Sequence, residues 1–214
     1  MGISDGPIYE MVAAIVSQLH QHGGVLVDVG CGSGRLRQYL AGSIDRYIGI
    51  DVVRYDDYPV DQEFELVDLD SGKSLLADEC ADVVAAVETI EHLENPRLLM
   101  RELERLVKPG GLVVVTTPTQ LSALSMLTLI VKGRFAAFQD VHYPAHLTAL
   151  LETDLRRMAS ECGLVDSQIQ YSHQGRIVLT SWHYPKFLSR LFPRALSDNL
   201  LIAARKLSVA GFTH

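Results

Sequence analysis

The chain has 214 residues, of which 48% are apolar and 21% are charged, and it contains 16 Gly and 8 Pro. These values lie near the averages of folded globular proteins and exclude collagen-like, low-complexity and disordered chains. Lys and Arg number 19 and Asp and Glu 26, which gives a net charge of −7, and only 7% of the residues are aromatic. An acidic chain with few aromatic residues is poorly suited to grip a nucleic-acid backbone or to stack bases, so no nucleic-acid partner is expected. At this length a single domain over residues 1–214 is expected.

The three cysteines, Cys31, Cys80 and Cys162, match neither a zinc motif nor a disulfide pattern. Unpaired cysteines indicate a reducing compartment, and we therefore expect a cytoplasmic protein. The N-terminus lacks the basic start and long apolar run of a secretory signal. The longest apolar stretch, residues 121–131, is shorter than the ~20 residues that span a bilayer, so no transmembrane segment is expected. The sequence leaves the oligomeric state open.

Short β-branched runs alternate with helical patterns along the first half of the chain, which is typical of βαβ units around a parallel sheet. A first helix is predicted to start near Pro7, because proline is favoured at the first position of a helix and apolar residues follow on one face. Strands are predicted at residues 25–29, 47–51, 64–68, 82–87 and 112–116. Helices are predicted between them at residues 34–40 and 95–107. Pro109, Gly110 and Gly111 then predict a turn into the next strand.

The pattern changes after Pro118. The apolar residues 121–131 predict a helix, and a loop rich in His, Tyr and Pro follows over residues 134–146. A further helix is expected at residues 153–162, with Gly163 as its end, and two closing strands are expected at residues 164–171 and 199–204. The charge is uneven along the chain, because residues 176–214 contain six basic residues and a single acid.

The most informative segment is V-D-V-G-C-G-S-G at residues 27–34, where a strand runs into a glycine loop that opens a helix. Glycine permits a tight bend and allows a ligand to approach the backbone closely. Such a loop can bind the pyrophosphate of a dinucleotide or the amino-acid part of another nucleotide cofactor. The dinucleotide fingerprint has glycine at its first, third and sixth positions, but here the sixth position is Arg35 and the third glycine is Gly34. This spacing disfavours a nicotinamide-dependent oxidoreductase.

Two acids lie beside this loop. Asp28 precedes the first glycine, where it would repel a pyrophosphate but attract a ligand that carries an ammonium and a sulfonium. Asp51 ends the second predicted strand, 21 residues beyond Gly30, where a carboxylate can accept hydrogen bonds from both ribose hydroxyls. The loop and the two acids together predict a site for a positively charged nucleotide cofactor.

With these residues the sequence resembles the class I S-adenosylmethionine-dependent methyltransferases, and the resemblance covers most of the chain. Further matching segments are IGID at 48–51, LVDLD at 66–70, VETIEHLENP at 87–96, VKPGGLVVVTTP at 107–118, HLTALLETDLRRMASECGL at 146–164 and DNLLIAARK at 198–206. The resemblance implies an α/β, Rossmann-like fold with a seven-stranded, mostly parallel sheet, an antiparallel last strand and helices on both faces. It also implies an S-adenosylmethionine-dependent methyltransferase that acts on a small-molecule acceptor at oxygen.

The residues that the resemblance assigns to the cofactor follow the first four strands. They are Asp28, Gly30, Cys31, Gly32, Gly34, Asp51, Val52, Asp68, Leu69, Val87 and Glu88. In this set the loop glycines approach the methionine part of the cofactor, and Asp28 faces its amino group. Asp51 holds the ribose hydroxyls, whereas Val52 and Asp68 contact the adenine. The residues after the fourth strand close the methionine end.

Glu88, Glu91 and His92 form an E-x-x-E-H motif at the end of the fourth predicted strand. In a helical turn, residues at i, i+3 and i+4 share one face, so the three side chains can converge. Two carboxylates and an imidazole suit a divalent cation such as Mg²⁺ or Zn²⁺. Here the sequence resembles the methyltransferases of quinone rings and of small-RNA ends, in which this spacing binds a metal. His146 matches the position of a fourth ligand, so the resemblance implies a metal site formed by Glu88, Glu91, His92 and His146.

Other interpretations of this motif remain open. Without a metal, His92 or His146 is the candidate catalytic base that removes a proton from an acceptor hydroxyl. Proximity and alignment alone can also carry methyl transfer from an activated sulfonium. For the chain as a whole, the alternative function is that of a non-catalytic S-adenosylmethionine-binding regulator or partner subunit.

Residues 119–146 are expected to form a cap that reads the acceptor. The predicted helix at 121–131 has more apolar residues than one face of a short helix needs, and Lys132 and Arg134 follow it. The basic C-terminal part adds further cations among aromatic and aliphatic residues. Apolar surface edged by cations predicts an amphiphilic or lipid-linked acceptor, reached at a membrane surface. The alternative is that the two segments pack on each other as core or at a dimer interface.

Overall fold

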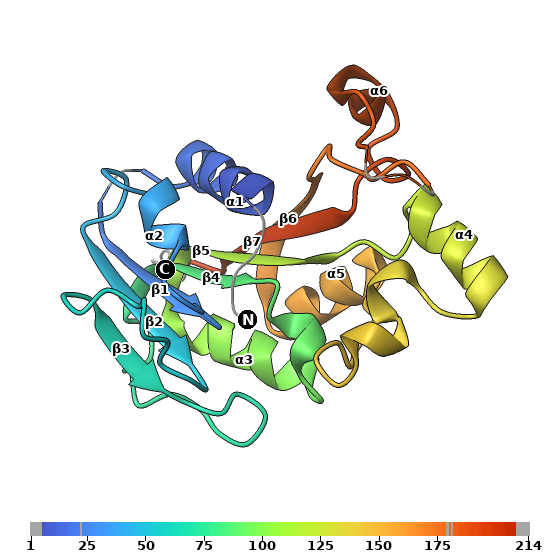
Figure 1. Cartoon of the computed structure of the whole chain (residues 1–214). Helices are drawn as coiled ribbons and strands as arrows, with labels where there is room; N and C mark the ends of the chain where they lie inside the picture. Colours follow the sequence, from blue (N-terminus) through green and yellow to red (C-terminus); the bar gives the residue numbers. More distant parts are fainter. Residues whose placement is uncertain (1–5, 22, 179, 181, 209–214) are drawn as a thin grey trace.

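The computed structural model describes residues 6–21, 23–178, 180 and 182–208. These residues form one seven-stranded sheet in the order β3-β2-β1-β4-β5-β7-β6 (Figure 1). The strands are β1 (Val25–Val29), β2 (Arg46–Asp51), β3 (Glu63–Leu66), β4 (Ala81–Val87), β5 (Val107–Pro118), β6 (Leu164–Tyr171) and β7 (Asn199–Lys206). Strands β1 to β5 pair in parallel, and β7 runs antiparallel to both β5 and β6. The predicted α/β fold, with a mostly parallel sheet and an antiparallel last strand, is confirmed.

Helices cover both faces of the sheet. α1 (Gly6–Leu19) and α2 (Leu36–Tyr39) lie on one face, and α3 (Pro96–Leu106) and α5 (Glu152–Glu161) lie on the other (Figure 1). The buried residues of α1 include Ile8, Val12 and Ile15, whose spacing of three and four places them on one side of the helix. Each face of the sheet has its own apolar cluster. Because both faces are covered, the central strand β4 reads A-D-V-V-A-A-V and is buried along nearly its whole length.

Caps fix the helix ends that flank the candidate site. At the start of α3 the N–H of Leu98 donates to Oδ1 of Asn95 at 3.2 Å. α4 (Ala123–Lys132) begins in the same way, because the N–H of Ser125 donates to Oγ of Ser122 at 3.2 Å, and it ends at Gly133 with φ 71°. Both helices therefore form within two residues of their predicted bounds.

Three predicted bounds were wrong. The turn predicted after α3 lies inside β5, where Ala81 pairs with Val107 and Val83 with Leu112, so the residues between bulge out of the ladder. The strand predicted at 64–68 ends earlier, because a turn closes over Asp68, whose carboxylate accepts from the N–H of Asp70 at 3.1 Å. The helix predicted at 34–40 is reduced to one turn, since Gly34 has a φ of 74° and cannot belong to it.

The segment between β5 and α5 extends beyond the end of the sheet. It contains α4 and two short 3₁₀ turns, η2 (Ala136–Phe138) and η3 (Asp140–His142). α6 (Lys186–Leu191) lies at the same end of the molecule (Figure 1). The N–H of Ala123 donates to the carbonyl of Ala195 at 2.7 Å and so joins the start of α4 to the chain that follows α6. The outward faces of both helices are exposed and are not part of the core. Among the described residues, no helix has the length and apolarity needed to cross a bilayer.

Candidate functional site

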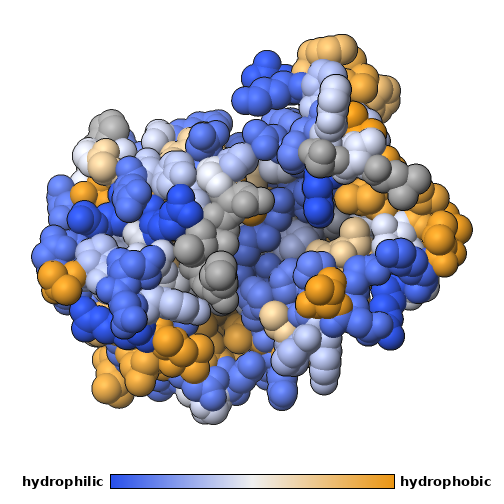
Figure 2. Space-filling model, in the orientation of Figure 1, coloured by the Kyte–Doolittle hydropathy of each residue, from blue (hydrophilic) through white to orange (hydrophobic). Residues whose placement is uncertain are grey.

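A cavity of about 1010 Å³ opens at the carboxyl ends of β1, β2 and β4. In Figure 2 it is the hydrophilic hollow between the two halves of the visible face. Most of the residues predicted from the sequence line it. These are Asp28, Gly30, Cys31, Asp51, Val52, Asp68, Leu69, Val87, Glu88, Glu91, His92 and His146. The cavity thus brings the cofactor residues and the E-x-x-E-H motif together at the edge of the sheet where ligands bind in open α/β folds.

The glycine loop forms part of one wall of the cavity. The N–H groups of Gly30 and Cys31 donate to the carbonyl of Ile50 at 2.8 and 3.1 Å, which ties the loop to the end of β2. Gly30 has a φ of 74°, and a Cβ built on it would lie 2.2 Å from Oγ1 of Thr89, so only glycine fits there. Of the predicted loop glycines, Gly32 and Gly34 are not among the described residues that line the cavity.

Gly32 and Gly34 have structural roles in the loop. The N–H of Gly32 donates to Oδ2 of Asp51 at 2.8 Å, so it shapes the loop and orients the carboxylate. A Cβ on Gly34 would lie 3.1 Å from the ring of Tyr58, so its small size lets the loop pack closely on that ring. Neither contact tests the prediction that these two glycines approach the ligand, which stays a prediction.

Among the acids that the sequence assigns to the cofactor, Asp28 is the most deeply buried. Its Oδ2 accepts a hydrogen bond of 2.5 Å from the hydroxyl of Tyr47, while its Oδ1 has no hydrogen-bond partner among the described residues. Burial raises the pKa of Asp28 to about 7, although the Tyr47 hydrogen bond opposes this shift. A buried carboxylate with one free oxygen at a cavity wall fits a cationic group of a ligand.

The neighbouring acids follow the next two strands. Asp51 lines the cavity with one oxygen bound to the glycine loop, and Val52 beside it is 58% exposed. Asp68 is exposed at the same wall, and the apolar side chain of Leu69 is buried behind it. Two carboxylates beside an accessible aliphatic side chain suit a nucleoside, whose hydroxyls and amine donate hydrogen bonds and whose base is apolar on its faces.

Glu88 is held in place by two strands of the sheet. It adopts a φ of 51°, a left-handed conformation that is uncommon for a residue other than glycine. Oγ1 of Thr116 donates to its Oε1 at 3.0 Å, and Nδ2 of Asn199 donates to its Oε2 at 2.8 Å. These bonds draw the carboxylate toward β5 and β7. Glu88 therefore lines the cavity but does not belong to the group of potential metal ligands that its motif suggests.

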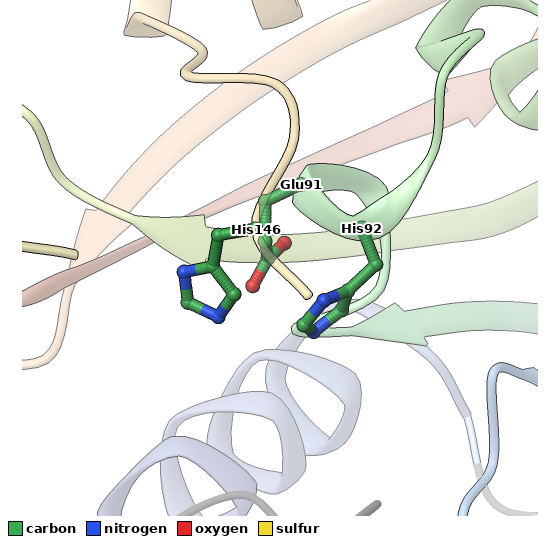
Figure 3. A group of neighbouring side chains, drawn as sticks. All are labelled: Glu91, His92 and His146. Carbon is green, nitrogen blue, oxygen red and sulfur yellow. The ribbon is translucent and has the colours of Figure 1, made fainter. Parts of the chain in front are cut away.

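Glu91, His92 and His146 do converge, as Figure 3 shows. One potential ligand atom from each lies within 4.8 Å of the others. Glu91 and His92 belong to η1 (Ile90–His92), whereas His146 comes from the segment before α5. The N–H groups of Leu147 and Thr148 donate to the carbonyl of Glu91 at 2.9 and 3.0 Å and hold the two segments together.

The hydrogen bonds of the two histidines favour ligation. Nδ1–H of His92 donates to the carbonyl of Ala145 at 2.6 Å, and Nδ1–H of His146 donates to that of Ala137 at 2.7 Å. Each imidazole therefore has Nε2 left as an acceptor, which is the arrangement that metal-ligating histidines use. Burial, with His92 and His142 nearby, lowers the pKa of His146 and keeps it neutral.

Glu91 is completely buried, and neither carboxylate oxygen has a hydrogen-bond partner among the described residues. Burial, together with the nearby charge of Glu88, raises the pKa of Glu91 well above its usual value, although the side chain of Thr117 lies close enough to oppose the rise. An unpartnered buried carboxyl is costly unless something binds it, so this oxygen pair is the clearest sign of a ligand in the group.

Several residues that shape the site were not predicted from the sequence. Tyr47 orients Asp28, Thr89 packs on Gly30, and Asn199 anchors Glu88. Each acts on a residue from another strand, so no local pattern marks it. The N-terminus of α1 also lines the cavity through Pro7, Ile8 and Tyr9, although the sequence predicts only its packing face.

Comparison with known proteins identifies the family. Residues 9–169 match the sequence profile of a family described as a methyltransferase domain. A ubiquinone biosynthesis O-methyltransferase of Thiobacillus denitrificans is 31% identical over 156 residues, which cover 67% of this chain and 66% of the relative. Another protein of that name, from Xylella fastidiosa, is 31% identical over 150 residues, which cover 60% of this chain and 59% of the relative. The chain thus spans about three fifths to two thirds of the length of these relatives.

Solved structures agree on the fold. An S-adenosylmethionine-dependent methyltransferase from Archaeoglobus fulgidus superposes with a TM-score of 0.64 at 17% identity, covering 92% of this chain and 94% of that one. At this identity the likeness supports the fold alone, but the sequence profile extends over most of the chain. The protein therefore belongs to the class I S-adenosylmethionine-dependent methyltransferase family.

Proposed function

We propose that this enzyme methylates a hydroxyl oxygen of a small-molecule acceptor. The observation that carries the proposal is a single cavity with Asp28 and Asp51 on one wall and the group of Glu91, His92 and His146 on another. Bound S-adenosylmethionine supplies a methyl group made electrophilic by its sulfonium. The similarity to O-methyltransferases of ubiquinone biosynthesis supports oxygen as the attacking atom.

The cofactor residues keep the roles expected from the sequence, and Gly32 and Gly34 complete the loop beside the methionine part. The free Oδ1 of Asp28 accepts from the ammonium of the methionine part, near Gly30 and Cys31, and Asp51 binds the ribose hydroxyls. The adenine lies against Val52, with Asp68 and the backbone of Leu69 at its edge. Val87 and Glu88 close the methionine end beside the acceptor.

The acceptor hydroxyl faces the group of Glu91, His92 and His146. Two imidazole nitrogens and one carboxylate are a ligand set that zinc and similar ions use at catalytic sites with an open position, whereas Mg²⁺ prefers oxygen ligands. The unpartnered carboxylate of Glu91 supports a bound Zn²⁺, which would lower the pKa of the acceptor hydroxyl. In the metal-free alternative, Nε2 of His92 or His146 takes the hydroxyl proton as the methyl arrives.

Residues 119–146 form a cap over the acceptor part of the cavity within a single methyltransferase domain. The inner side of this segment contributes apolar lining through Leu124, Ala136 and Ala137, next to the group that faces the acceptor hydroxyl. An acceptor with an apolar body and a reactive hydroxyl fits this lining, so we expect an amphiphilic or lipid-linked molecule. The three free cysteines support a reducing compartment, and we place the reaction in the cytoplasm.

The test is transfer of labelled methyl from S-adenosylmethionine to a panel of phenols, catechols and quinols with short and long alkyl chains. Transfer to oxygen is the expected result. Glu91→Gln and His146→Gln should lose turnover while retaining calorimetric binding of S-adenosylhomocysteine, and His20→Gln, which changes a histidine outside the cavity, is the matched control.

Chelation separates the two mechanisms. If a metal acts, turnover falls after exhaustive chelation and returns with added Zn²⁺. Full turnover in the chelated enzyme would eliminate the metal and leave either the histidine base or proximity and alignment alone. Transfer to nitrogen or carbon acceptors only would contradict the proposed oxygen chemistry.

A further inference from the structure

The outward faces of α4 and α6 form an exposed surface that we call the apolar–basic surface. Its apolar members are Ile130 (77% exposed) and Val131 (70%) on α4, with Phe187 (69%) and Leu191 (68%) on α6. Figure 2 shows hydrophobic side chains gathered over these two helices at one end of the molecule. A cluster of protruding apolar side chains is typical of a surface that binds a protein or a membrane.

Cations flank these apolar side chains. On α6, Lys186 and Arg190 are four residues apart and so form a basic stripe next to the apolar pair Phe187 and Leu191. Lys132 follows the apolar face of α4. None of these three cations forms an ion pair with another residue in the described part of the chain. The surface is therefore basic although the whole chain carries a net charge of −7.

We propose that the apolar–basic surface docks the enzyme on an anionic lipid bilayer. Apolar side chains beside lysine and arginine match a lipid surface, where the apolar groups enter the acyl boundary and the cations contact anionic headgroups. A symmetric contact between two copies would instead place Lys186 and Arg190 of one copy near those of the other. Like charges oppose such a contact, so the charge pattern favours the bilayer over a second copy of this chain.

The surface is joined to the cavity by α4 itself. Leu124 and Ser125 face the cavity, whereas Ile130 and Val131 on the outer side face solvent. A docked enzyme would thus have the cap segment between the bilayer and the acceptor site. Vesicle binding does not depend on which acceptor the enzyme uses, so its failure would leave the proposed methyl transfer untouched.

The experiment is flotation of the full chain with vesicles of phosphatidylcholine, with and without phosphatidylglycerol, at low and high salt. The wild-type protein should float with the anionic vesicles at low salt and much less at high salt or with neutral vesicles. Lys186→Gln combined with Arg190→Gln should weaken binding roughly 25-fold, since each cation contributes roughly fivefold at an anionic surface. Ile130→Glu combined with Phe187→Glu should abolish flotation.

The matched control is Leu75→Glu, because Leu75 is an apolar residue 94% exposed in the loop that follows β3, at the opposite edge of the sheet. It should float like the wild type. Calorimetric binding of S-adenosylhomocysteine verifies that each variant is folded. The proposal is overturned if wild-type protein does not float, or if the Ile130 and Phe187 variant floats unchanged. It is also overturned if that variant only converts a dimer to a monomer in light scattering.

Discussion

Replacing Asp28 by asparagine should strengthen the fold and weaken the cofactor site at the same time. The Tyr47 hydroxyl can still donate to the side-chain oxygen of asparagine, so the packing around the residue is retained. What changes is the charge. Burial holds the pKa of Asp28 near 7, above its usual 3.8, so keeping this carboxylate ionised costs stability.

The direction in which stability changes with pH follows from proton linkage. Between pH 3.8 and about 7, the folded state keeps a proton on Asp28 that the unfolded state has lost, so stability falls as the pH rises through this range. A difference of about three between the folded and unfolded pKa corresponds to roughly 4 kcal/mol at pH 8, where both states are ionised. The neutral side chain of the Asp28→Asn variant carries no such cost. At about 2–4 °C per kcal/mol, the variant should melt roughly 8–16 °C higher at pH 8 without cofactor.

The assay compares thermal unfolding of wild type and Asp28→Asn from pH 4 to pH 8. The difference in Tm should be large at pH 8 and vanish near pH 4, whereas Glu94→Gln, at an exposed carboxyl, should leave the pH profile unchanged. Affinity of the variant for S-adenosylhomocysteine should fall by roughly 10- to 100-fold, the range for a hydrogen bond to a charged group. A constant Tm difference across this pH range, or unaltered affinity, would refute the reasoning.

Asp51→Ala should weaken S-adenosylhomocysteine binding by roughly 1–3 kcal/mol in calorimetry, because the variant loses the carboxylate proposed to hold the ribose hydroxyls and seen to orient the loop through Gly32. Wild-type affinity would count against the ribose role. Gly30→Ala should destabilise the fold by roughly 2–5 kcal/mol in urea unfolding, since its Cβ collides with Thr89 at a positive φ. Adding Thr89→Ala should restore part of that loss, and no restoration would exclude the clash as its cause. Glu91→Gln should raise the Tm of the chelated protein at neutral pH, because burial raises the pKa of Glu91 and makes its ionised form costly. The affinity of this variant for Zn²⁺ should fall at least tenfold. A variant that binds zinc normally would remove Glu91 from the ligand set.

Local sequence patterns were enough to predict the structure wherever it depends on residues close together in the chain. The alternation of apolar runs and helical spacings predicted the α/β sheet, and the caps at Asn95 and Ser122 place two helices within two residues of their expected ends. The glycine loop and the acids at the ends of β1 and β2 were also visible, because parallel strands bring their carboxyl ends to one edge. The register of β5 was not visible in the sequence, because its bulge depends on pairing with β4.

The environment of each acid could not be predicted from the sequence and is set by the tertiary structure. Asp28 meets Tyr47, 19 residues away, and Glu88 meets Asn199, 111 residues away, and these contacts separate Glu88 from the histidines that its motif suggested. His146 reaches Glu91 because the chain beside it is bound to η1 by backbone hydrogen bonds. The sequence by itself determined the kinds of groups at the site, because type and spacing are local properties. Which groups meet, and with what charge, was decided by packing between distant segments, because burial and partners set the cost of each ionised form.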